Sequence, residues 1–285
     1  MSVGENLKRV RDGIEDACAR AGRQPSEITL IAVSKTVEPQ QVFEGIRAGA
    51  TDLGENWVQE AVGKRPIVER MLREGNAECR MQSAECRAPE PDGPRDDARE
   101  GPNQAPETKN QEPGTTNPGL RFGVRWHMIG HLQTNKVKKA LEVFDTFQGV
   151  DSLRLAQELD RRAAQAGRTV DALMEVNTSG EASKFGVPPE QVSAIAREIV
   201  GLKNVRLQGL MTIGPGLSVE DPEVARPCFR LLRELRDRLQ AELGVPLPCL
   251  SMGMSSDYAV AIQEGATMLR IGTAIFGART YPAPR

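Results

Sequence analysis

Short apolar runs alternate with helical patterns along most of this 285-residue chain, and the alternation constrains its fold more than any other feature. Continuous apolar runs of this length are typical of strands buried on both faces of a parallel sheet. Most are followed by an amphipathic helical pattern, which predicts an α/β fold. The runs lie at 28–33, 51–53, 124–129, 146–150, 172–176, 205–210, 249–250 and 268–271.

Eight strands that alternate with helices have two main solutions, an open doubly wound sheet and a closed barrel. Periodicity does not separate them. The count of eight, together with the phosphate-binding signals described below, favours a (β/α)₈ TIM barrel. Such barrels commonly form one domain of roughly 250 residues. We therefore expect residues 1–285 to form a single barrel domain.

One segment, 75–121, interrupts the alternation. It contains seven prolines and five glycines, and Met81 and Leu120 are its only large apolar side chains. A segment of this composition buries too little apolar surface to offset the entropy of ordering it. We expect a helix to end near Arg73 and a disordered, low-complexity surface insertion to follow. It is either tolerated extra length or a partner-binding tail or lid.

Composition excludes several classes of function. The net charge of -2 and the pI near 5.9 favour neither nucleic acid nor an anionic membrane as a partner. A signal peptide and a membrane span are both missing from the sequence, which predicts a cytoplasmic protein. The five cysteines are dispersed, and the interval from His127 to His131 is not a metal motif on a strand, so we expect neither a disulfide framework nor a bound metal.

Polar residues follow the apolar runs directly, and in a barrel these strand ends meet at one mouth where ligands bind. Lys35 stands out because it comes immediately after the apolar run at 28–33. Desolvation there favours the neutral amine, which is the nucleophile that forms a Schiff base. The alternative is a lysine that reaches out from the barrel rim into solvent.

The last two strands carry the signals for phosphate. Ser251, Ser255 and Ser256 surround Gly253, and Gly272–Thr273 offers similar groups one strand later. Barrels often bind phosphate with the loops after strands 7 and 8. The alternative is that both segments are ordinary helix caps.

These motifs resemble those of the pyridoxal phosphate homeostasis proteins, whose barrel is similar to the N-terminal domain of bacterial alanine racemase. The resemblance covers nearly all of the chain outside 75–121. It rests on IAVSKTVEP at 31–39, GENWVQEA at 54–61, WHMIGHLQTNK at 126–136, EVNTSGEASKFGV at 175–187, LQGLMTI at 207–213, LSMGMSSDYAVAI at 250–262 and MLRIGTAIFGAR at 268–279.

The resemblance implies a fold type III barrel that binds pyridoxal 5′-phosphate covalently through N6 of Lys35. It also implies a role for each of seven further positions. Ser251, Gly272 and Thr273 match phosphate-binding positions, and Arg270 matches the position that faces the pyridine nitrogen. The residues that match the lining of the ring pocket are Asn56, Met211 and Met252.

The function implied is that of a carrier without catalytic turnover, which buffers the cofactor and supplies it to apo-enzymes. A guanidinium at residue 270 cannot accept a proton from the pyridine nitrogen, so carbanion chemistry should be weak. The main alternative is an amino-acid racemase of the same fold type, which needs a second base. Neither Tyr258 nor Tyr281 is obviously placed for that role. A third possibility is an aldolase-type barrel enzyme in which Lys35 forms a Schiff base with a sugar phosphate. We expect a monomer.

Overall fold

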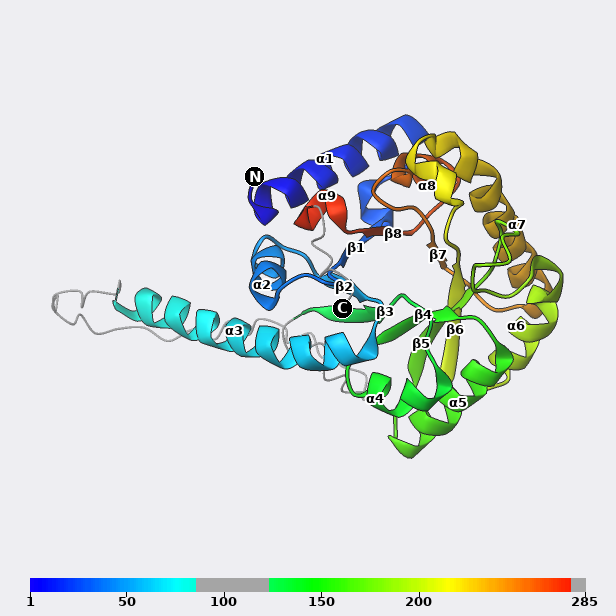
Figure 1. Ribbon diagram of the computed structural model, residues 1–285, viewed down its shortest axis with the longest axis horizontal. Coiled ribbons are helices and arrows are strands. Elements are labelled where there is room, and N and C mark those ends of the chain that lie inside the picture. Colours follow the sequence, from blue (N-terminus) through cyan, green and yellow to red (C-terminus); the bar gives the residue numbers. More distant parts are fainter. Residues whose placement is uncertain (86–122, 278–285) are drawn as a thin grey trace, which may run out of the picture.

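The computed structural model describes residues 1–85 and 123–277 (Figure 1). Eight parallel strands pair in sequence order, and β8 pairs with β1 to close the barrel. The prediction of a closed (β/α)₈ barrel is therefore confirmed, and the open sheet is excluded. The strands are β1 Thr29–Val33, β2 Asp52–Glu55, β3 Arg125–Met128, β4 Thr146–Val150, β5 Val170–Glu175, β6 Val205–Met211, β7 Cys249–Ser251 and β8 Met268–Ile271.

Helices form an outer ring around these strands (Figure 1). The ring closes where α1 packs against α2 on one side and against α8 and α9 on the other. Short 3₁₀ turns lie at Pro25–Glu27, Thr134–Lys136, Pro189–Gln191, Gly216–Val219 and Pro222–Ala225. The helices are α1 Val3–Ala21, α2 Pro39–Arg47, α3 Val58–Glu85, α4 Val137–Leu141, α5 Leu153–Gln165, α6 Val192–Val200, α7 Arg226–Leu243, α8 Tyr258–Gln263 and α9 Thr273–Phe276.

The sequence determines where these helices begin and end. Helix α1 opens with a capping box, in which the Ser2 side chain and Glu5 satisfy each other's backbone N–H groups. Ser152 accepts a hydrogen bond from the Leu155 N–H and so caps α5. Both β2 and β4 are buried at every position, as expected for strands of a parallel barrel. The sequence of β4 is consequently uncharged, whereas β2 contains two buried carboxylates, Asp52 and Glu55.

The expected end of the helix before the insertion was wrong. Helix α3 does not stop near Arg73 but continues to Glu85 and extends beyond the barrel (Figure 1). Residues 76–85 contain neither proline nor glycine and are rich in good helix formers, and the first proline of the segment is Pro89. The rest of the predicted insertion, 86–121, lies outside the described residues.

Candidate cofactor-binding site

A pocket of about 300 Å³ opens at the carboxyl ends of the strands, on the side where barrels bind ligands. Its size falls within the range of small-molecule sites. Residues from the ends of β1, β2, β7 and β8 share its wall, which brings together groups far apart in sequence. The lining residues are Val33, Lys35, Asn56, Ile129, Ile213, Val219, Met254, Ser255, Ser256, Arg270, Gly272 and Thr273.

Lys35 lines this pocket from the turn that follows β1. The neighbouring residues hold this turn in an unusual shape. Thr36 has a φ of 61°, a left-handed conformation that residues other than glycine seldom adopt. Such backbone is retained only where the surroundings fix it firmly. The half-buried Lys35 therefore projects from a constrained segment.

A buried ionic cluster fixes the turn, and sequence reasoning did not find it. Lys64 of α3 donates to the Ser34 carbonyl at 2.6 Å, to Glu55 at 2.7 Å and to Glu60 at 2.6 Å. The Ser34 hydroxyl also donates to Glu55, at 2.7 Å. Burial raises the pKa of Glu55, against the opposing effect of the nearby Lys64 charge. Glu60 also accepts from the Thr36 N–H, so the cluster fastens helix α3 to the residues on both sides of Lys35.

Another part of the pocket wall is a cradle of hydroxyl and backbone groups. Ser255 and Ser256 come from the turn after β7, and Gly272 and Thr273 come from the end of β8. The Thr273 hydroxyl lies 3.2 Å from that of Ser255. These groups can donate several hydrogen bonds to an anion, and the first N–H groups of α9 are not used within the helix.

Gly253 makes the turn into this cradle possible. Its φ is 94°, and a Cβ at this position would lie 2.6 Å from the Cβ of Ala261. A larger residue is therefore excluded both by conformation and by space. The glycine that the sequence singled out consequently shapes the cradle.

Arg270 supplies a buried cation at the pocket. Its guanidinium donates to the Ser251 hydroxyl at 2.6 Å and to the Thr212 carbonyl at 2.7 Å. Burial lowers the pKa of Arg270 to about 10, and the charges of Glu175 and Asp257 oppose this effect. At neutral pH the guanidinium therefore remains charged, and it lies in the same pocket as Lys35.

Three of the predicted site residues are not among those that line this pocket. Ser251, Met211 and Met252 are completely buried and do not belong to the pocket lining. The Ser251 hydroxyl donates to Gln148 at 2.7 Å and accepts from Arg270, so it is engaged in the barrel interior. Five predicted residues do meet at the pocket: Lys35, Asn56, Arg270, Gly272 and Thr273.

A second pocket, of about 440 Å³, shares Asn56, Ile129 and Ile213 with the first. Glu175, at the end of β5, lines it and is almost completely buried. Burial raises the pKa of Glu175 to about 7; the Asp151 charge raises it too, whereas Arg270 opposes the rise. A carboxyl group that titrates near neutrality thus lies beside the Lys35 pocket.

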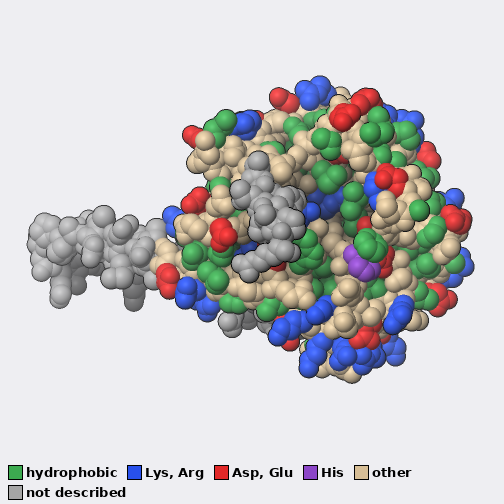
Figure 2. Space-filling view, viewed as in Figure 1, with side chains coloured by type: hydrophobic (Ala, Val, Ile, Leu, Met, Phe, Trp, Pro, Cys, Tyr) green, Lys and Arg blue, Asp and Glu red, His purple; other side chains and the backbone are tan. Residues whose placement is uncertain are grey.

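Exposed apolar side chains surround these two pockets. Figure 2 shows hydrophobic side chains gathered around the middle of the visible face, over the barrel. Trp57, Phe185, Ile213 and Val219 all line a pocket and are between 38% and 72% exposed. Phe185 stacks on His131 with ring centroids 4.0 Å apart. The entrance to the site is therefore apolar and partly aromatic.

The two histidines have separate partners. His127 points into the barrel and contacts Asp52 at 2.9 Å, whereas His131 contacts Asp151 at 2.6 Å near the mouth. Among the described residues, His, Cys, Asp and Glu side chains form no group suited to holding a metal ion. Within the same residues, none of the helices is both long and apolar enough to cross a membrane.

The fold and the site together define a class of protein. The family model described as "Alanine racemase, N-terminal domain" matches residues 6–280, so the chain is a barrel of this class. A pyridoxal phosphate homeostasis protein of Aquifex aeolicus is 38% identical over 281 residues, 99% of this chain and all of the relative. One of Escherichia coli K12 is 36% identical over 98% of this chain and 97% of its own length. The chain belongs to the pyridoxal phosphate homeostasis protein family, as its motifs predicted.

Solved structures agree with this assignment. PipY of Synechococcus elongatus, in a structure with PLP bound, has a TM-score of 0.67 and 29% identity. The match covers 97% of this chain and 100% of PipY. An alanine racemase of Clostridium difficile has a TM-score of 0.63 at 13% identity, covering 98% of this chain and 60% of the racemase. That second likeness shows the shared barrel fold.

Proposed function

We propose that the protein binds pyridoxal 5′-phosphate as a Schiff base on N6 of Lys35, and that it stores and delivers the cofactor without catalytic turnover. The observation that carries the proposal is the position of Lys35, which shares one pocket with an anion cradle and a buried guanidinium. The relatives named for pyridoxal phosphate homeostasis, and the related structure with PLP bound, support the same ligand.

The described side chains fit each part of this cofactor. Ser255, Ser256 and Thr273 provide hydroxyl donors for the phosphate, and the Gly272–Thr273 backbone adds N–H groups. Val33 and Ile129 offer apolar contacts for the ring. Lys35 supplies the amine that condenses with the aldehyde. The pocket volume of about 300 Å³ is large enough for a ligand of this size.

Arg270 favours storage over catalysis. When bound, the cofactor can act as an electron sink for substrate carbanions, most strongly when its ring nitrogen carries a proton. Arg270 has only donor groups, so it cannot accept a hydrogen bond from a protonated ring nitrogen and would favour the unprotonated ring. A site built around this guanidinium therefore holds the aldehyde while providing little driving force for carbanion chemistry.

The racemase alternative requires a second base, and Tyr258 is not in position to act as one. Tyr258 begins α8, and its hydroxyl faces Gly13 of α1 in the outer helical layer. A Cβ added at Gly13 would lie 2.5 Å from that hydroxyl oxygen. The other tyrosine, Tyr281, lies outside the described residues. We accordingly favour the carrier over the racemase.

Apo-enzymes that use the cofactor are the proposed recipients, and they would approach the apolar entrance around the pocket. The proposed location is the cytoplasm, whose reducing conditions agree with free thiols at Cys18, Cys228 and Cys249. A monomeric state remains a prediction from the sequence.

Reduction with borohydride tests the proposal directly. The purified protein should absorb visible light when loaded with pyridoxal phosphate, and borohydride should fix a pyridoxyl group on the peptide that contains Lys35. Lys35→Ala should lose this label and keep its fold by circular dichroism. A stable label on another lysine, or a protein that stays colourless with added cofactor, would overturn the proposal. Turnover of L-alanine at ordinary enzymatic rates would overturn the carrier role.

A further inference from the structure

A chain of buried polar side chains crosses the barrel interior from Arg270 to the opposite end. The Ser251 hydroxyl accepts from Arg270 at 2.6 Å and donates to the Gln148 side-chain oxygen at 2.7 Å. The Gln148 nitrogen lies 3.1 Å from Nδ1 of His127, and Nε2 of His127 lies 2.9 Å from Asp52. Each of the five side chains is at most 5% exposed.

The two ends of this chain fix the direction of every hydrogen bond in it. Arginine has only donors and an ionised carboxylate has only acceptors. Since Ser251 accepts from Arg270, its own hydrogen is available to Gln148, and the Gln148 nitrogen must then donate to Nδ1 of His127. His127 is consequently the neutral tautomer with hydrogen on Nε2, and it donates to Asp52.

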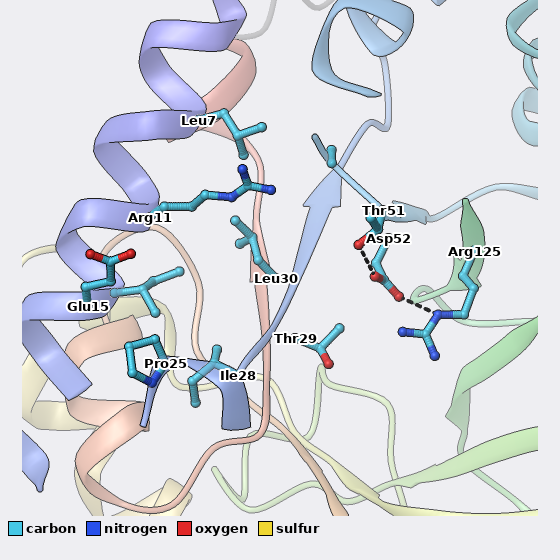
Figure 3. A pocket seen from close by; sticks show the side chains of 12 residues that line it. Leu7, Arg11, Glu15, Pro25, Ile28, Thr29, Leu30, Thr51, Asp52 and Arg125 are labelled. Carbon is cyan, nitrogen blue, oxygen red and sulfur yellow. Dashed lines mark hydrogen bonds and ion pairs between the residues drawn. The ribbon is translucent and has the colours of Figure 1, made fainter. Parts of the chain in front are cut away.

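Asp52 is well suited to end the chain. Burial would raise the pKa of Asp52, but hydrogen bonds from His127 and Thr51 and the charge of Arg125 lower it overall. Arg125 holds the same carboxylate at 2.9 Å, and Thr51 donates to it at 2.7 Å. Figure 3 shows these three side chains together beside a pocket at the amino ends of the strands. The far end of the chain is therefore a fixed, ionised anchor.

We propose that Asp52, His127 and Gln148 are positioning residues that act through Ser251 to hold the Arg270 guanidinium in the cofactor pocket. Arg270 is long and flexible, and the carboxylates of Glu175 and Asp257 lie close enough to attract it. Because the Ser251 hydroxyl donates its hydrogen to Gln148, its oxygen lone pair is directed at Arg270. This hydrogen bond keeps the guanidinium from turning toward those carboxylates. The proposal rests on the proposed function, since it assigns these residues a role in holding Arg270 in the pocket that would bind the cofactor.

Gln148→Leu breaks two links of the chain at once and is the test variant. We expect the loaded variant to retain the label on Lys35 but to show a shifted visible absorbance maximum and about tenfold faster release of cofactor. In an Arg270→Gln background, Gln148→Leu should cause no further change, because no guanidinium remains to be held.

Phe147→Leu is the matched control, because Phe147 is adjacent to Gln148 in β4 but is not part of the hydrogen-bonded series. Its ring packs edge-on against Phe144. The substitution should lower the melting temperature and leave the absorbance maximum unchanged. A folded, labelled Gln148→Leu protein with the wild-type spectrum and release rate would overturn the positioning role and leave the proposed function intact. Failure of the wild-type protein to label at Lys35 would instead refute the proposed function.

Nitrogen NMR of the wild-type apo-protein provides a second measurement that does not depend on any variant folding. The sequence contains only two histidines, so ¹⁵N-histidine labelling gives few signals, and His131→Asn assigns them. His127 should show hydrogen on Nε2 and an unprotonated, hydrogen-bonded Nδ1 at neutral pH. The opposite tautomer, or a doubly protonated ring, would overturn the proposed direction of the chain.

Discussion

Glu60 accepts a hydrogen bond from the backbone N–H of Thr36 at 2.5 Å, with the same carboxylate oxygen that binds Lys64 at 2.6 Å. Helix α3 thereby holds the residue that follows Lys35 in its left-handed conformation. Lys64 holds the preceding residue through the Ser34 carbonyl. The geometry of the Lys35 backbone is therefore set by side chains that are not among the residues lining its pocket.

Lys64→Met should destabilise the protein strongly. The substitution leaves the fully buried Glu55 without its cation. Removing one partner of a buried ion pair lowers the free energy of unfolding by about 3–5 kcal/mol. Urea denaturation followed by circular dichroism measures the change. The rate of borohydride-stable labelling at Lys35 should fall as well, because the turn loses its anchor.

Adding Glu55→Gln to the Lys64 variant is the control for this interpretation. The double variant has no unpaired buried charge, so it should recover part of the lost free energy of unfolding while labelling stays slow. Equal stability of the single variant and the wild-type protein would contradict the role assigned to the cluster.

Glu175→Gln should flatten the dependence of stability on pH. The folded-state pKa of about 7 exceeds the ordinary value of 4.5, so the native state binds the proton more tightly than the unfolded state does. The stability of the wild-type protein therefore falls as pH rises from 4.5 to 7, by at most about 3 kcal/mol from this group. At pH 8 the variant should melt above the wild-type protein, and at pH 5 the two should nearly coincide.

Melting curves between pH 5 and pH 8 test this expectation, with Glu190→Gln on the exposed surface as a control. The control should follow the wild-type profile throughout. A Glu175→Gln profile parallel to that of the wild-type protein would show that this carboxyl group does not titrate in the range.

Ser255→Ala should weaken the binding of pyridoxal phosphate by about tenfold and leave the binding of pyridoxal, which lacks phosphate, nearly unchanged. Ser255 lines the pocket, whereas Ser251 is engaged with Gln148 and Arg270. Ser251→Ala should consequently change the binding of both ligands by similar factors. Fluorescence titration gives the dissociation constants of the two ligands for each variant. A loss of affinity for pyridoxal phosphate alone in Ser251→Ala would show that Ser251, and not Ser255, binds the phosphate.

Deletion of residues 86–121 should leave the visible spectrum and the label on Lys35 unchanged. The cut begins after the last residue of α3 and ends before β3, so every described residue that lines the pocket is kept. A short glycine-rich linker replaces the segment. Loss of cofactor binding would show that the deleted residues help to form the site.

Much of the fold could be predicted because local sequence and barrel topology agree. Each apolar run overlaps a strand, and Lys35 could be placed at the mouth because it directly follows the first run. The direction in which a side chain points at a strand end is harder to predict from sequence. Ser251 and Ser255 are four residues apart in one motif, yet only closure of the barrel decides which of them faces the pocket.

The ionic cluster and the interior chain could not be predicted for a related reason. Glu60 and Lys64 resemble an ordinary surface pair one helical turn apart. Only tertiary packing places them against Ser34 and Glu55. His127 and Gln148 likewise come from different strands, and no sequence spacing relates them.

The ionic cluster beside Lys35 also bears on selectivity. A free aldehyde reacts with any accessible neutral amine, and the Lys64 nitrogen lies 2.6 Å from the Ser34 carbonyl in the same turn. All three donor positions of its ammonium group are engaged, so it has no lone pair to offer an electrophile. In the proposed binding mode, Lys64 therefore serves as a structural cation and does not compete with Lys35 for the aldehyde.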